Sequence, residues 1–121
     1  MKKIVFSILA ALMLSSCQNL LFDWQVGDAN SEVTKTFQSA QKTQIKITFD
    51  DQSYCIQAHG IELKVIGNGI IIHTQIISSL PTTKQISVPV NSSIEVVTKA
   101  VPLNNDNSCK TLGNVFCRLY Y

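Results

Sequence analysis

The sequence has few of the side chains on which enzymes depend. It contains two histidines, and charged residues make up 15% of its 121 positions. The zinc-protease motif HExxH, the CxxC motif and a Gly-rich phosphate loop leading into a helix are all absent. We therefore predict a protein without catalytic activity, without a metal or other cofactor, and without a small-molecule substrate.

The two histidines, His59 and His73, do not form a ligand set at the spacing found in zinc sites. His59 falls at the start of a predicted hairpin, and His73 lies within a predicted strand. Asp50 and Asp51 are adjacent, so on an extended strand end their side chains point to opposite faces. We expect two structural or exposed histidines and a turn at the two aspartates.

A basic surface for nucleic acid is also missing. Ten Lys and Arg residues stand against eight Asp and Glu, but Lys2 and Lys3 account for the excess. The rest of the chain is neutral and contains one arginine, Arg118. This charge balance argues against a nucleic-acid partner.

The N-terminus is organised as a secretory signal peptide. Lys2 and Lys3 precede the apolar run Ile4–Leu14, and small residues follow it. The run is too short to span a bilayer as a helix, which takes about 20 residues. We predict a cleaved signal peptide over residues 1–16.

The tetrad Leu14-Ser15-Ser16-Cys17 resembles the bacterial lipobox. The resemblance implies cleavage before Cys17 and acylation of its thiol and new amine. Several acyl chains, at ~0.8 kcal/mol per buried methylene, give a stable anchor in membrane lipid. Gln18 stands where inner-membrane lipoproteins carry aspartate, which implies the outer membrane, with the domain facing the periplasm. The alternative is an ordinary signal peptide with a chance cysteine.

Three cysteines remain for an oxidising compartment: Cys55, Cys109 and Cys117. Cys109 and Cys117 are the favoured disulfide pair, because they close a short loop rich in turn-forming residues. Pairing of Cys55 with Cys117 or with Cys109 stays open, because spacing alone does not fix connectivity. If Cys55 is left over, we expect it to be buried.

Removal of residues 1–16 leaves 105 residues, enough for one compact domain. Apolar residues alternate with polar ones over 44–49 and 61–65, which predicts half-buried strands. Gly67-Asn68-Gly69 predicts a tight turn, so residues 60–78 form a β-hairpin. The isoleucine-rich part, residues 70–77, is apolar on both faces and predicts a central strand.

Further strands are expected at 33–39, 53–58, 84–90, 94–101 and 115–120, separated by turn-forming residues. Seven or eight short strands without a helix predict an all-β fold, a small antiparallel β-sandwich of the transthyretin or immunoglobulin kind. We predict a lipidated tether over 17–32 and the sandwich over 33–121. The tether is unusually apolar at Leu20, Leu21, Phe22 and Trp24, so it either lies at the membrane interface or docks on a partner or on the domain itself.

The stretch from 102 to 114 is long for a connection in so small a domain, and such loops are often functional. Its centre, Asn104, Asn105, Asp106 and Asn107, is a candidate partner-binding loop. A solvated loop without a function is the alternative.

The lipobox, the length and the strand pattern resemble the small outer-membrane lipoproteins of type VI secretion systems. The resemblance implies a non-enzymatic assembly component of an envelope-spanning machine that binds the periplasmic domain of an inner-membrane protein. Tyr54-Cys55 followed by Gly60 resembles a segment of the lipoprotein inhibitors of c-type lysozyme, which is one alternative. A phage or plasmid exclusion lipoprotein is another.

Overall fold

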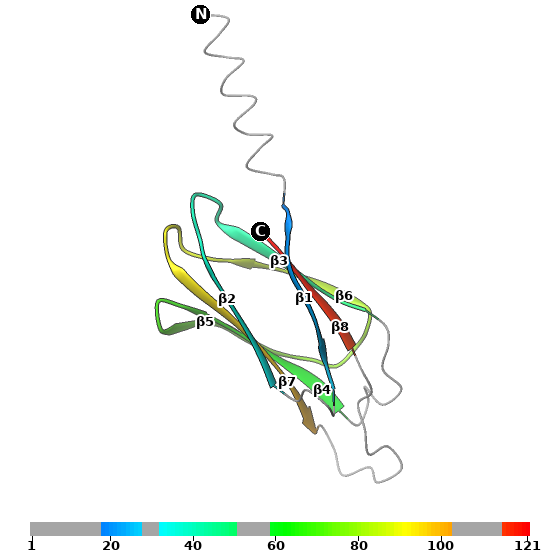
Figure 1. Ribbon diagram of the computed structural model, residues 1–121. Coiled ribbons are helices and arrows are strands. Elements are labelled where there is room, and N and C mark those ends of the chain that lie inside the picture. The colour runs from blue at the N-terminus through cyan, green and yellow to red at the C-terminus, as the bar shows by residue number, and fades with distance from the viewer. Residues whose placement is uncertain (1–17, 28–31, 51–58, 103–114) are drawn as a thin grey trace, which may run out of the picture.

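The computed structural model describes residues 18–27, 32–50, 59–102 and 115–121, and these form a sandwich of two antiparallel four-stranded sheets (Figure 1). The eight strands are β1 (Leu20–Val26), β2 (Glu32–Gln38), β3 (Gln44–Phe49), β4 (His59–Gly67), β5 (Ile70–Ile77), β6 (Thr82–Ser87), β7 (Ser93–Pro102) and β8 (Val115–Tyr120). One sheet has the order β1-β8-β3-β6 and the other β2-β7-β4-β5. The predicted all-β sandwich is confirmed.

Alternation along the strands builds the core. In β3, Ile45, Ile47 and Phe49 are buried while the residues between them are partly or fully exposed. Side chains of both sheets interdigitate in this way, since successive residues of a strand point to opposite faces. The remaining buried apolar residues are Trp24, Val26, Ile61, Leu63, Val65, Ile77, Ile86, Val88, Ile94, Val96, Val115, Cys117 and Leu119.

The predicted hairpin is present as β4 and β5. Asn68 and Gly69 form its two-residue turn, and both have positive φ, at 50° and 80°. A type I′ turn requires this conformation at both central residues, and Asn-Gly adopts it most readily. The Asn68 side chain also ties the turn to the next one: its Nδ2 donates to Ser92 Oγ at 3.0 Å, and its Oδ1 accepts from the Ser93 amide.

The predicted boundary between tether and sandwich is wrong. Residues 20–26 form β1, which pairs with β8 along its length and is an edge strand of the first sheet. Phe22, Trp24 and Val26 alternate with Asp23 and Gln25, and the inward-facing Trp24 and Val26 are buried. The sandwich therefore begins at Leu20, because this segment docks on its own domain.

The predicted position of strand 70–77 is also wrong. β5 pairs with β4 on one side and is the edge of its sheet, whereas β4 and β7 are central. The predicted strand at 53–58 lies outside the described residues. No helix among the described residues is long and apolar enough to cross a membrane.

Candidate functional site

The most unusual surface of the sandwich is the edge strand β5. Its sequence, IIIHTQII, contains no Asp, Glu, Lys or Arg. Ile70, Ile71, Ile72 and Ile76 are 69%, 54%, 38% and 50% exposed, and we call these four residues the isoleucine edge. Natural sheets protect long edges with charges, prolines or short strands, since an exposed apolar edge invites another chain to pair with it.

Among the described strands, the other three edges carry such protection. β2 contains Glu32 and Lys35, and β1 contains Asp23 and an irregularity in its pairing with β8. β6 has six residues, contains a lysine, and is bracketed by Pro81 and Pro89. β5 is the longest of the four edge strands and lacks charge altogether.

The register of the hairpin shows which isoleucines serve the core. Ile77 stands opposite the buried Ile61 and is itself 3% exposed. Ile76 stands opposite Glu62, on the outer face, and Ile71 stands opposite Ile66. A register shift between Val65 and Ile66 interrupts the alternation, which explains why three consecutive isoleucines are exposed beside the turn.

His73 lies on the same strand but on the inner side, opposite the buried Val65. Its Nε2 lies 3.1 Å from Gln75 Oε1, and the ring is partly exposed. His73 and Gln75 thus occupy inward positions that are usually apolar in a closed sandwich. The space between the sheets is therefore more accessible to solvent beside β5 than in the core.

The opposite side of the sandwich is closed. β1 contacts both β2 and β7, whereas no comparable contact joins β5 to β6 among the described strands. The Trp24 indole N–H donates to Thr98 Oγ1 at 2.9 Å, which links the two sheets through a buried hydrogen bond. Thr98 is fully buried, and burying its hydroxyl without a hydrogen-bond partner would destabilise the fold, so the Trp24 indole supplies a needed partner.

A pocket of about 600 Å³ lies beside this closed side, with Asp23, Lys35 and Cys117 in its lining. The lining contains no histidine that would serve as a base for the thiol. Burial raises the pKa of Cys117 to about 12, with a smaller contribution from the negative charge of Asp50. Such a thiol is protonated at neutral pH and is a poor nucleophile.

Cys117 differs from its predicted role. It stands opposite Trp24 and Phe49, faces the core and is a free thiol in the structure, not bonded to Cys109. The physical reason is its strand position, because alternation in β8 directs its side chain inward between Val115 and Leu119. Cys55 and Cys109 lie outside the described residues, and a bond between those two stays a prediction.

The other predicted site residues cannot be placed together. The candidate loop Asn104, Asn105, Asp106 and Asn107 lies outside the described residues, as does Cys17. His59 begins β4, far along the strand from the turn. No group of three or more His, Cys, Asp or Glu residues in the described part of the chain is placed to hold a metal ion.

The sequence pattern reveals the isoleucine run but does not identify it as an exposed edge. The absence of any charge from eight consecutive strand residues was visible. That signal fits two situations, a strand covered on both faces and an edge that a partner covers. Sequence position alone does not separate them.

Comparison with known proteins bears on the N-terminus. Residues 1–18 match the model for the prokaryotic membrane lipoprotein lipid attachment site. No curated protein matches the chain. Among solved structures, dimeric latent PorU from Porphyromonas gingivalis is similar, at 13% identity and a TM-score of 0.34, over 87% of this chain and 13% of that one. The lipid attachment site makes the chain a bacterial lipoprotein anchored to a membrane through Cys17.

Proposed function

We propose that this lipoprotein is a non-enzymatic binding protein whose isoleucine edge accepts an extended segment of a partner protein as an added strand. The observation that carries the proposal is a long edge strand with four exposed isoleucines and no charge. Strand addition uses backbone hydrogen bonds for affinity and alternate side chains for specificity. Burial of a fully exposed isoleucine contributes about 1.5–3 kcal/mol, so the half-exposed isoleucines supply part of the affinity and the backbone hydrogen bonds of the added strand supply the rest.

The chemistry of the edge defines the partner segment. Glu62 and Lys64 of the neighbouring strand approach each other at 3.8 Å, so the outer face beside β5 has no net charge. A segment with alternating apolar side chains and no charge of its own complements this surface. The setting that we propose is an envelope-spanning secretion machine of the type VI kind, with the anchor in the outer membrane and the partner segment in the periplasmic domain of an inner-membrane protein.

The test is site-specific photo-crosslinking of the full-length lipoprotein in its native cells. A photoreactive residue at position 71 or 76 should form a crosslink to an extended segment of one envelope protein, identified by mass spectrometry of the joined peptides. The same residue at position 34 or 36 on β2, the other edge of the same sheet, should give none. Thr34 and Thr36 are exposed, so the two pairs of positions are matched.

The double variant Ile71→Lys/Ile76→Lys should weaken the binding at least about tenfold, since each added charge must be desolvated at the edge. Thr34→Lys/Thr36→Lys is the matched control and should leave it unchanged. Crosslinks that join two copies of this chain, or that survive the charged variant, would contradict the proposal.

A further inference from the structure

We infer that the end of the sandwich beside the anchor docks on the bilayer that holds the Cys17 lipid. The surface, which we call the collar, consists of Leu20, Leu21, Lys42, Lys46, Tyr120 and Tyr121. Its occupant is the headgroup and upper acyl layer of that bilayer. This inference does not depend on the proposed partner.

The chain leaves almost no free length between lipid and domain. Asn19 is already paired with Tyr121: the Asn19 amide donates to the Tyr121 carbonyl at 2.8 Å, and the Tyr121 amide donates back to Asn19 at 2.9 Å. Gln18 also donates from its side chain to the Gln44 carbonyl at 3.2 Å. Two residues span at most about 7 Å, so this end of the sandwich lies at the membrane surface.

The apolar part of the collar results from an irregularity in β1. Leu20 stands opposite Tyr120, but Phe22 stands opposite Leu119, so Leu21 is an extra residue in the ladder. A bulge breaks the two-residue alternation. Both leucines are consequently exposed, at 49% and 40%, within four residues of the lipid.

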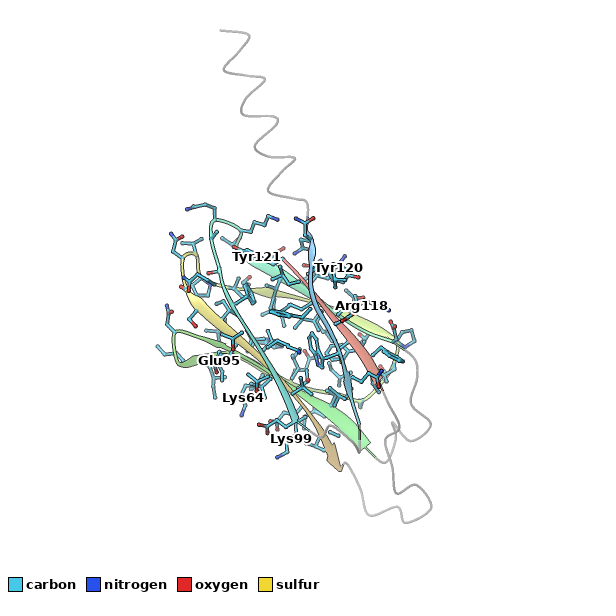
Figure 2. The ribbon with its side chains drawn as sticks, in the orientation of Figure 1. Lys64, Glu95, Lys99, Arg118, Tyr120 and Tyr121 are labelled. Atoms are coloured by element: carbon cyan, nitrogen blue, oxygen red, sulfur yellow. The ribbon has the colours of Figure 1, made fainter. Side chains whose placement is uncertain are left out.

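Aromatic and basic side chains surround the leucines. Lys46 Nζ lies 4.5 Å from the centre of the Tyr120 ring, and Lys42 Nζ lies 5.5 Å from that of Tyr121. The Tyr121 hydroxyl donates to the Lys42 carbonyl and accepts from the Ala40 amide, which fixes the ring at this end. Figure 2 shows Tyr120 and Tyr121 near the start of β1, away from Lys64 and Lys99.

The composition of the collar matches a membrane interface. Tyr and Lys side chains favour this location, because the apolar body lies in the interface and the polar tip in the headgroups. Tyr120 and Lys46 supply these groups here, whereas the Tyr121 hydroxyl is bonded within the domain. The described residues 18–22, 39–46 and 119–121 contain no Asp or Glu, so none of their side chains carries a negative charge that would repel anionic lipid. The first carboxylate along β1, Asp23, is one row further from the anchor, opposite Arg118.

The test uses the full lipidated protein in vesicles of phosphatidylethanolamine and phosphatidylglycerol that carry a photoreactive headgroup. Crosslinks should concentrate on residues 18–22, 40–46 and 119–121. The variant Leu20→Ser/Leu21→Ser should lower their yield at least about threefold while the lipid keeps the protein on the vesicle. Ile71→Ser/Ile76→Ser, the matched pair on β5, should leave the yield unchanged.

A second variant, Lys46→Glu, tests the same surface through charge. It should lower the crosslink yield in the phosphatidylglycerol vesicles and leave it unchanged in neutral phosphatidylcholine vesicles, since the attraction acts on anionic lipid. Crosslinks spread evenly over both sheets would overturn the inference. So would a yield that the serine pair does not alter, or crosslinks gathered on β5.

Discussion

The two lateral sides of this sandwich differ in how their edge strands are protected from pairing with another chain. On the β1/β2 side, a buried tryptophan bonds across to a threonine of the other sheet, and charged residues protect both edges. On the β5/β6 side, β6 is short and bracketed by prolines, but β5 is long, uncharged and rich in exposed isoleucine. The difference teaches that the exposed isoleucines of the open side, unlike the buried Ile77, add little to the core, so their apolar surface is left for another chain.

The strongest test of this contrast compares two neighbouring isoleucines of β5. Ile77→Ala should lower the free energy of unfolding by about 2–5 kcal/mol, because it leaves a cavity in the core. Ile76→Ala should change it by no more than about 0.5 kcal/mol, because that side chain is half exposed. Urea unfolding followed by circular dichroism measures both. A comparable loss for both variants would show that the isoleucine edge supports the fold.

The closed side can be weakened at its inter-sheet hydrogen bond. Trp24→Phe should lower the free energy of unfolding by about 1–3 kcal/mol, since the buried Thr98 hydroxyl keeps only a 3.5 Å contact with the Val33 carbonyl. Thr98→Val removes the hydroxyl that accepts this hydrogen bond and provides the second single variant. In a double-mutant cycle the pair should cost less than the sum of the single changes. Strict additivity would mean that the bond does not couple the sheets.

A smaller effect is expected from alkaline pH, through Cys117 on the closed side. The folded-state pKa of about 12 lies above the ordinary value of 9.0, so the unfolded chain loses the thiol proton first. Stability should therefore fall as pH rises from 9 towards 12, by roughly 1.4 kcal/mol at pH 10. Cys117→Ala should lack this component in urea titrations at pH 8 and pH 10. If the free energy of unfolding changed equally between pH 8 and pH 10 in the two proteins, the thiol would have to be in contact with solvent.

Much of this fold follows from local signals in the sequence. Alternation at Ile45, Ile47 and Phe49 predicts a half-buried strand, and Asn68-Gly69 predicts the turn of the hairpin, because both depend on neighbouring residues alone. Strand order is different, since it depends on which distant segments pair. The run at 70–77 therefore predicted a strand correctly and its place in the sheet wrongly.

The two errors near the candidate surfaces have distinct causes. The position after Cys17 predicts a tether, although Phe22, Trp24 and Val26 already show a two-residue period. Loop length favours the disulfide, but it says nothing of the face on which Cys117 lies. The collar required knowledge of the bulge at Leu21, and single-residue irregularities in a ladder have no reliable sequence pattern.

The pairing of Asn19 with Tyr121 also determines how the molecule would carry a mechanical load. A pull on the lipid acts along β1, parallel to its length, while the hydrogen bonds of the β1–β8 ladder lie across that direction. Such a force shears the whole ladder at once instead of opening it bond by bond. A partner held at β5 would pull on the other sheet, so tension between membrane and partner would cross the core, where the Trp24–Thr98 hydrogen bond is one of the links between the sheets.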